Sequence, residues 1–163
     1  MELIWKSIDN KEIKILNAWL TRQDKHNLCM TQKSWEQTAF DINDCLKNMD
    51  NVQFKNIMGY ANGQPVVAIM FAIENTGVLN LYNIVVNPVC RNMGIAKNAI
   101  IQLLKNDSSL KLIVPYKKVK ASTLPDNEEA QQLFKSLNFD NLGYNGEYVV
   151  FEKGITNINE KQK

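Results

Sequence analysis

The N-terminal third of the chain carries apolar residues at helical spacing. Over residues 31–48 the apolar positions recur every three or four residues and therefore fall on one face of a helix. This face comprises Trp35, Ala39, Ile42 and Leu46. Apolar side chains are also frequent over residues 8–20. We therefore expect two N-terminal helices, one over each of these ranges.

The middle of the chain has the composition of β-strands separated by turn residues. The pair Asn62-Gly63 predicts a tight hairpin, because both central positions of such a turn favour a positive φ angle. Pro88 lacks the N–H group that a strand ladder needs, so a strand should end before it. We expect an antiparallel meander of three strands, over residues 54–61, 64–73 and 78–86.

The C-terminal half mixes helical and strand patterns. A continuous apolar stripe predicts a helix over residues 94–106, and an acidic first turn after a proline predicts another over 127–137. Strands are expected over residues 117–123, 139–144 and 147–153. This order indicates an α+β, or mixed α/β, fold built around one sheet. We expect a single domain over residues 1–153, followed by a polar, frayed tail over residues 154–163.

Composition and charge exclude several functional classes. The 163 residues include 19 Lys and Arg against 17 Asp and Glu, which gives no sequence-wide attraction to nucleic acid. No apolar run has the length of a membrane span or of a signal peptide, so we expect a cytoplasmic protein with no membrane partner. Three scattered cysteines and one histidine do not supply the usual ligands of a zinc site, and we expect no metal.

The junction between the third strand and the following helix has the features of a phosphate-binding site. The strand ends at Pro88, a short loop follows, and a helix opens at Gly94. The first amides of a helix have no partner within the helix and bind anions, and a glycine lets the backbone approach a ligand closely. Arg91 and Lys97 would add charge-assisted contacts. This segment is therefore a candidate cradle for a diphosphate.

Two sequence motifs resemble those of the GNAT superfamily of N-acetyltransferases. The run Arg91-Asn92-Met93-Gly94-Ile95-Ala96 resembles the family's Q/R-x-x-G-x-G/A signature and follows a strand that ends in the pattern Ile-x-Val-x-Pro. A second block, over residues 127–139, resembles the family's N-x-x-A-x-x-L-Y/F-x-x-x-G-F helix in spacing and order. With the hairpin upstream, the resemblance covers residues 54–153.

The resemblance implies a fold, a cosubstrate and a set of binding residues. It implies a mostly antiparallel, twisted sheet that is splayed in the middle and flanked by about four helices. It further implies that acetyl-CoA binds in the splay, and that the backbone of Ile84 polarises the thioester carbonyl as an amine attacks. We expect a monomer or a homodimer. The cofactor-binding residues implied are Ile84, Val85, Val86, Arg91, Asn92, Met93, Gly94, Ile95, Ala96, Lys97, Asn127 and Phe134.

Two departures from the family pattern concern proton transfer. Many members use a tyrosine at the position of Phe134 as the acid toward the leaving thiolate, and phenylalanine has no proton to give. Some members carry a glutamate base at the position of Asn80, and asparagine cannot act as a base near neutral pH. Glu74 and Tyr82 are the remaining candidates for proton transfer.

The acceptor is expected to be a primary amine, of a small molecule or of a protein N-terminus or lysine. Four acidic residues are candidates to face a cationic acceptor: Asp24, Asp41, Asp44 and Glu147. Surface solvation explains each of them equally well. An aminoglycoside, a polyamine, a free amino acid and a protein amine all remain open. Trp19 and Trp35 are expected to be core residues, with a wall of the acceptor pocket as the alternative.

Two other functions compete with this interpretation. The absence of a glutamate at position 80 and of a tyrosine at position 134 favours a GNAT-like module that binds acyl-CoA without catalysis; these positions hold Asn80 and Phe134. An unrelated nucleotide-binding α/β domain is the third alternative, but it requires a parallel sheet. The hairpins predicted at Asn62-Gly63 and at Asn145-Gly146 favour antiparallel pairing instead.

Overall fold

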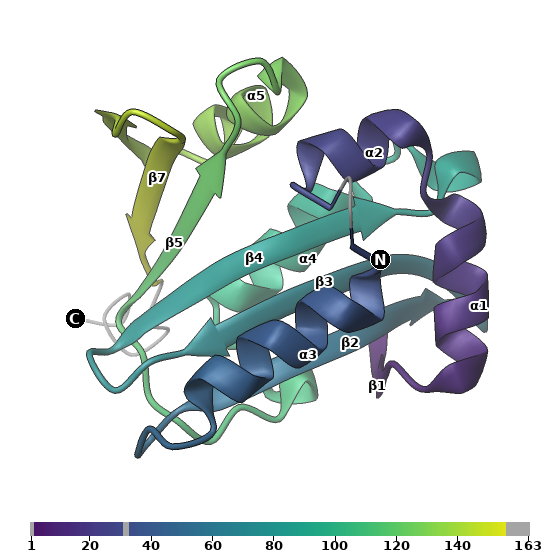
Figure 1. The fold of residues 1–163 in the computed structure, drawn as a ribbon, viewed down its shortest axis with the longest axis horizontal. Coiled ribbons are helices and arrows are strands. Elements are labelled where there is room, and N and C mark those ends of the chain that lie inside the picture. The colour runs from purple at the N-terminus through teal and green to yellow at the C-terminus, as the bar shows by residue number, and fades with distance from the viewer. Residues whose placement is uncertain (1, 31–32, 156–163) are drawn as a thin grey trace.

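One seven-stranded sheet organises the protein in a computed structural model that describes residues 2–30 and 33–155 (Figure 1). The strands are ordered β1-β2-β3-β4-β5-β7-β6. All neighbours pair antiparallel except β4 and β5, which pair parallel. The strands are β1 (Ile4–Ser7), β2 (Gln53–Ala61), β3 (Gln64–Ile73), β4 (Val78–Val86), β5 (Lys118–Thr123), β6 (Asp140–Tyr144) and β7 (Val149–Gly154). The expected mostly antiparallel α+β fold is confirmed, and the parallel-sheet alternative is wrong.

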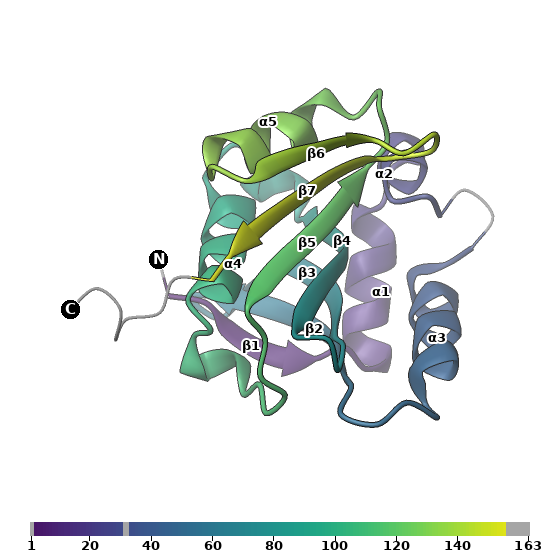
Figure 2. The ribbon, with the colours of Figure 1, turned by 90° about the vertical axis from the view of Figure 1, so that its left-hand side faces the viewer.

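Helices cover both faces of the sheet. Helices α1 and α3 lie on one face, and α4 and α5 lie on the other (Figure 2). The α-helices are α1 (Asn10–Trp19), α2 (Arg22–Asn27), α3 (Trp35–Leu46), α4 (Ile95–Leu104) and α5 (Glu128–Ser136). Two short 3-10 helices, Pro88–Cys90 and Ser108–Leu110, flank α4. The apolar stripes expected over residues 31–48 and 94–106 thus become the buried faces of α3 and α4.

The apolar pattern of the sequence did not predict strand β1 or helix α2, because neither buries a patterned face. Strand β1 has four residues, none of them buried, and adds to the edge of the sheet beside β2. Helix α2 has no buried residue at all, so no apolar periodicity marks it. Its signal is the capping box, in which Thr21 and Asp24 each accept a hydrogen bond from the other's backbone N–H group.

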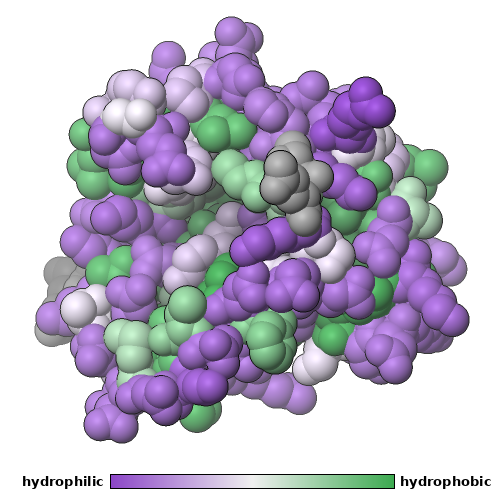
Figure 3. Space-filling view, viewed as in Figure 1, coloured by the Kyte–Doolittle hydropathy of each residue, from purple (hydrophilic) through white to green (hydrophobic). Residues whose placement is uncertain are grey.

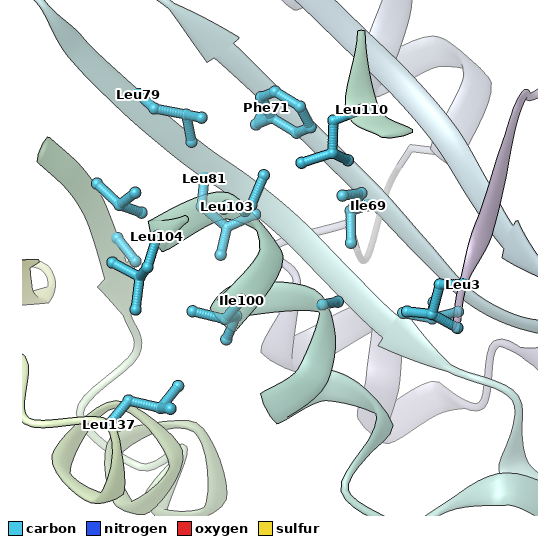
Figure 4. Packing of buried hydrophobic residues seen from close by; sticks show 14 of the residues in the cluster. Leu3, Ile69, Phe71, Leu79, Leu81, Ile100, Leu103, Leu104, Leu110 and Leu137 are labelled. Atoms are coloured by element: carbon cyan, nitrogen blue, oxygen red, sulfur yellow. The ribbon is translucent and has the colours of Figure 1, made fainter. Parts of the chain in front are cut away.

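The sheet separates two apolar cores. The larger one packs α4 and the end of α5 against the sheet, as Leu103, Ile100 and Leu137 show in Figure 4. The smaller one lies under α1 and α3 and includes the buried indoles of Trp19 and Trp35. Both tryptophans are therefore core residues, as expected. On the face viewed in Figure 3, the surface is mainly hydrophilic and its apolar patches are small.

A β-bulge in β4 marks the place where the sheet opens. Met70 of β3 pairs with Asn83 and the next residue pairs with Leu81, which leaves Tyr82 as the extra residue. Because of this shift, Leu81 belongs to the larger core whereas Val85 belongs to the smaller one. Pairing of β4 with β5 covers only Val78–Leu81 and then stops. The expected splay in the middle of the sheet is thus confirmed.

The C-terminal boundary lies slightly beyond the expected one. Strand β7 continues to Gly154, and the N–H group of Ile155 donates to the carbonyl of Lys117 over 2.9 Å. The two residues after Lys153 are therefore attached to the start of β5. The rest of the predicted tail, residues 156–163, lies outside the described residues.

Candidate active site

The opening between β4 and β5 holds a cavity of about 570 Å³. Its walls come from both strands, from the N-terminus of α4, from α5 and from α2. Apart from Met93, all the residues expected to bind the cofactor line it, and so does Tyr82. These lining residues are Tyr82, Ile84, Val85, Val86, Arg91, Asn92, Gly94, Ile95, Ala96, Lys97, Asn127 and Phe134.

Two of the expected site residues are not among those that line this cavity. The side chain of Met93 is 61% exposed on the loop before α4. Glu74 lies in the turn between β3 and β4, where its N–H group donates to the carbonyl of Val78 over 2.9 Å. Glu74 also lines neither this cavity nor the neighbouring one described below. Its charge nevertheless acts on Tyr82, which does line the cavity.

The N-terminus of α4 has the geometry of an anion cradle. Gly94 is the N-cap residue and adopts φ 76°, a left-handed conformation that favours glycine. No side chain caps the helix, and a Cβ atom placed on Gly94 would meet no described atom within 4 Å. The first intrahelical bond joins the N–H group of Asn98 to the carbonyl of Gly94 at 3.0 Å. The amides of the first turn are therefore available to oxygens of a bound anion.

The guanidinium of Arg91 is directed at a protein carboxylate. Its Nη2 donates to both carboxylate oxygens of Asp24, at 3.0 and 2.9 Å, and its Nε donates to the carbonyl of Val86 at 3.4 Å. Burial alone would raise the pKa of Asp24, but hydrogen bonds from Thr21 and Arg91 hold that pKa below its usual value. Arg91 thus anchors α2 to the loop before α4. Lys97 is the other cation that lines the cradle, and it is exposed at the first turn of α4. Unlike Arg91, it has no ion-pair partner among the described residues.

One edge of β4 is unpaired along the cavity. Beyond Leu81 the strand pairs only with β3, so its other edge faces the opening from Tyr82 to Val86. Free backbone N–H and C=O groups on such an edge can pair with the amides of an extended ligand, as an added strand would. The backbone of Ile84, expected to polarise a thioester, lies on this edge.

Asn127 and Phe134 reach the cavity from α5. Asn127 caps the helix, because its Oδ1 accepts a hydrogen bond from the N–H group of Ala130 over 3.2 Å. Phe134 is 3% exposed and packs on Phe139 and Phe151, with ring centroids 5.1 and 5.4 Å apart. Its ring is part of the larger core and forms the apolar floor of the cavity. Core packing explains a phenylalanine at this position.

Thr123 is a cavity residue that the sequence analysis did not single out. It ends β5 and is 6% exposed. Its hydroxyl is the one buried side-chain group in the described part of the chain that lacks a hydrogen-bond partner. Such a group is costly to bury unless something pairs with it. A ligand in the opening would supply that partner.

A second cavity, of about 360 Å³, adjoins the first. Tyr82 and Ser122 line both cavities and therefore stand where they meet. Residues of α2, α3, β4 and β5 form its walls, with Tyr148 from the last hairpin. Asn80, the position of the family's glutamate base, also lines it. Such an arrangement has room for two ligands side by side, which would meet near Tyr82.

Two tyrosine hydroxyls in the second cavity remain protonated well above neutral pH. Burial raises the pKa of Tyr82 above its usual value, and the charge of Glu74 adds to this effect. A hydrogen bond with Glu147, burial and a hydrogen bond with Cys29 raise the pKa of Tyr148 to about 12. Both phenols are therefore hydrogen-bond donors rather than bases under ordinary conditions. Tyr148 could not be singled out from the sequence, because only the fold brings the last hairpin beside Cys29, just after α2.

The four acidic residues considered as partners of a cationic acceptor are held by other contacts, and one of them, Asp24, lines the first cavity. Asp24 pairs with Arg91. Asp41 pairs with Lys33 at 2.6 Å, and Asp44 pairs with the lysine three residues later at 2.7 Å. Glu147 is exposed on the last hairpin and hydrogen-bonds Tyr148, which itself lines the second cavity. None of the four is among the described residues that line the second cavity.

Neither a metal site nor a spanning helix is found in the described residues. No group of three or more His, Cys, Asp and Glu side chains among residues 2–30 and 33–155 is placed to hold a metal ion. Within the same residues, no helix has the length and apolar character needed to cross a membrane. His26, the one histidine, instead contacts Asp126 over 2.9 Å and so links α2 to the loop before α5.

Comparisons with known proteins agree with this geometry. The chain matches no curated protein sequence at a significant level. The fold resembles three solved structures over nearly their whole length. The ribosomal-protein-S18-alanine N-acetyltransferase from Escherichia coli is 18% identical, with a TM-score of 0.60 and 95% of each chain covered. The spermidine N-acetyltransferase from Vibrio cholerae, solved with CoA and spermine, is 14% identical, with a TM-score of 0.67 and 94% of each chain covered.

The third structure and a family model complete the comparison. An acetyltransferase from Thermus thermophilus is 12% identical, with a TM-score of 0.70, and the match covers 95% of this chain and 98% of the other. The model of the acetyltransferase (GNAT) family matches residues 17–139. This range contains α3 to α5, the cradle at Gly94 and both motifs that resembled the family. The chain therefore belongs to the acetyltransferase (GNAT) family.

Proposed function

We propose that this protein is an acetyl-CoA-dependent N-acetyltransferase that acetylates a primary amine by direct attack. The observation that carries the proposal is the continuity of the two cavities. The larger one runs from the α4 N-terminus along the free edge of β4 and meets the smaller one at Tyr82 and Ser122. A long, amide-containing acyl carrier fits the first cavity, and an acceptor fits the second.

The chain's own groups suit two parts of acetyl-CoA, the diphosphate and the pantetheine arm. The α4 amides around Gly94 would hold the diphosphate, and Lys97 would add a charge-assisted contact. The free edge of β4 would pair with the amides of the pantetheine arm. Arg91 would act indirectly, because its guanidinium is engaged by Asp24 and positions the loop. When bound, acetyl-CoA supplies an activated acetyl group.

The reaction that follows is a balanced acyl transfer. The amine nitrogen forms a bond to the carbonyl carbon, the carbon–sulfur bond breaks, and the thiolate leaves with the electron pair. The amine loses one proton and the thiolate gains one. Backbone N–H groups of β4 near Ile84 would stabilise the negative charge on the carbonyl oxygen. Binding both reactants in adjoining cavities supplies proximity and orientation.

In the absence of a tyrosine at position 134, two hydroxyls of the cavities are candidates to assist the leaving sulfur. Tyr82 stands at the junction of the cavities, and its raised pKa makes it a donor rather than a base. Thr123 has an unpaired hydroxyl in the first cavity. We propose Tyr82 as the proton donor and Thr123 as a hydrogen-bond donor to the bound thioester or pantetheine. Acid assistance to a thiolate is modest, because a thiol already has a pKa near 8.5.

The competing function is an acyl-CoA-binding module without catalysis. Asn80 favours it, because no carboxylate stands at the position of the family's base. The second cavity favours catalysis, because a pure binder has no need for an acceptor site beside the carrier. Release of CoA thiol from acetyl-CoA, measured with and without a panel of primary amines, separates the two. Amine-dependent release supports the enzyme, whereas affinity for acetyl-CoA without amine-dependent release supports the binder.

A further inference from the structure

The second cavity carries one charged side chain among its described lining residues. That residue is Lys120 of β5. The other lining groups are amides such as Asn80, hydroxyls such as Ser122 and Tyr148, and apolar side chains. No described carboxylate lines the cavity. A site built to hold a polycation would place carboxylates against it, since charge complementarity guides recognition.

Lys120 has no ion-pair partner among the described residues. It lies directly opposite Glu152 in the register between β5 and β7. The Glu152 carboxylate is bound instead by the ammonium of Lys118, at 3.2 Å. Lys120 is half-buried, so its charge is less screened than that of a solvated surface lysine. An unpaired ammonium in a cavity is a binding point for an anion.

The register places Lys120 beside the position where acyl transfer would occur. On the parallel β4–β5 pair, Lys120 is directly opposite Asn80. Tyr82, two residues further along β4, marks the junction with the larger cavity. A small acceptor whose anionic group is bound by Lys120 could therefore direct its own amine at that junction.

We infer that the acceptor is a small primary amine that carries its own carboxylate or phosphate group, and that Lys120 binds that group. The inference rests on the proposed acetyltransferase function and names its substrate class. A cavity of about 360 Å³ is at the lower end of the range for small-molecule sites, which suits a compact acceptor. With no described carboxylate among its lining residues, the cavity gives the ammonium form of the acceptor no protein counter-charge, so the amine gives up its proton to water before it attacks.

Matched pairs of amines test the substrate class directly. CoA release would be measured with acetyl-CoA and L-methionine against L-methioninamide, which lacks the carboxylate. Glucosamine 6-phosphate would be compared with glucosamine in the same way, so that the two arms distinguish a carboxylate from a phosphate. Spermidine, kanamycin and a peptide with a free N-terminus would represent the cationic and protein acceptors. We expect kcat/KM to be at least about 10-fold higher for the anionic member of one pair.

Variants of Lys120 test its role in that preference. In Lys120→Met the KM for the preferred anionic amine should rise about 10- to 100-fold, the cost of losing a hydrogen bond to a charged group. The KM for the partner amine that lacks the anionic group should stay within about twofold, and so should the affinity for acetyl-CoA. Lys120→Arg should retain most of the preference. Lys135→Met is the matched control, because Lys135 is exposed on α5 and lines neither cavity.

The outcomes separate this inference from the proposed function. If the protein binds acetyl-CoA and acetylates spermidine, kanamycin or the peptide but no anionic amine, the function stands and the inference is overturned. The inference is also overturned if Lys120→Met leaves the preference unchanged, or if acetyl-CoA binds and no anionic amine reacts. If acetyl-CoA does not bind at all, the proposed function itself fails, and the inference fails with it.

Discussion

Arg91 and Asp24 form an ion pair that joins two parts of the chain 67 residues apart, with one guanidinium nitrogen 3.0 and 2.9 Å from the two carboxylate oxygens. The pair fixes α2, which has no buried residue of its own, against the loop that leads into α4. Helix α2 lines both cavities. Its position therefore depends on polar contacts more than on apolar packing.

Replacement of Asp24 should weaken this attachment in a pH-dependent way. The pKa of Asp24 is lowered in the folded protein, so its contribution to stability is present above the ordinary pKa of aspartate and disappears as the pH falls through the lowered value. We expect Asp24→Asn to cost about 1 kcal/mol at pH 7. Urea unfolding at pH 7 and at pH about 2, well below the ordinary pKa of aspartate, measures this. An equal loss at both pH values would contradict the role of the charge.

Gly94 should matter more for the binding of acetyl-CoA than for the stability of the fold. Gly94→Glu is expected to cost about 1 kcal/mol of stability, because φ 76° is unfavourable for a residue with a Cβ. It should also weaken acetyl-CoA binding by at least about 100-fold, since it places a carboxylate at the phosphate cradle. Gly63→Glu is the matched control, because Gly63 has φ 77° and equally open surroundings but lies in the β2–β3 hairpin.

These two glycine variants separate strain from binding. Both should lose similar stability in thermal unfolding, and only Gly94→Glu should lose affinity for acetyl-CoA. If a folded Gly94→Glu protein binds acetyl-CoA as tightly as Gly63→Glu, the phosphates do not lie on α4.

The unpaired hydroxyl of Thr123 predicts opposite effects on stability and on binding. Thr123→Val removes a buried polar group without a partner, so the free protein should become more stable by about 1 kcal/mol. The affinity for acetyl-CoA should fall about 5- to 10-fold, because the hydroxyl would no longer donate to the ligand. Thr123→Ser should preserve the affinity. Unchanged binding in Thr123→Val would exclude a contact between this hydroxyl and the ligand.

Tyr82 should affect turnover more than binding. Tyr82→Phe is expected to lower kcat about 100-fold with the best acceptor, while the dissociation constant for acetyl-CoA stays within about twofold. Because burial raises the pKa of Tyr82, its hydroxyl stays protonated up to pH about 10, and kcat should not fall from its ionisation below that pH. Stopped-flow or steady-state rates across pH about 6 to 10 test both points. A Tyr82→Phe enzyme with full kcat would exclude Tyr82 as the donor.

Elements with strong apolar periodicity or turn chemistry could be predicted from the sequence. The stripe that contains Ala99, Ile100 and Leu103 indicated α4, and Asn62-Gly63 indicated the β2–β3 hairpin. The polar helix α2 and the edge strand β1 could not be found in this way, because neither buries a patterned face.

The site was predictable only where its residues are close in sequence. The loop and helix start at residues 84–97 form one segment, so their shared cavity follows from local structure. The order of the strands in the sheet brings Tyr148 and Lys120 to the second cavity. The sequence pattern alone does not specify that order. The ion pair of Asp24 with Arg91 is likewise a tertiary contact that the sequence pattern did not indicate.

Calorimetric titration of the purified protein with acetyl-CoA, beside free CoA and ATP, would show whether the cavity along β4 binds coenzyme A. We expect micromolar binding of both CoA species and much weaker binding of ATP, because the free edge of β4 would recognise the pantetheine arm that ATP lacks. Absence of binding by either CoA species, or equal binding of ATP, would contradict it.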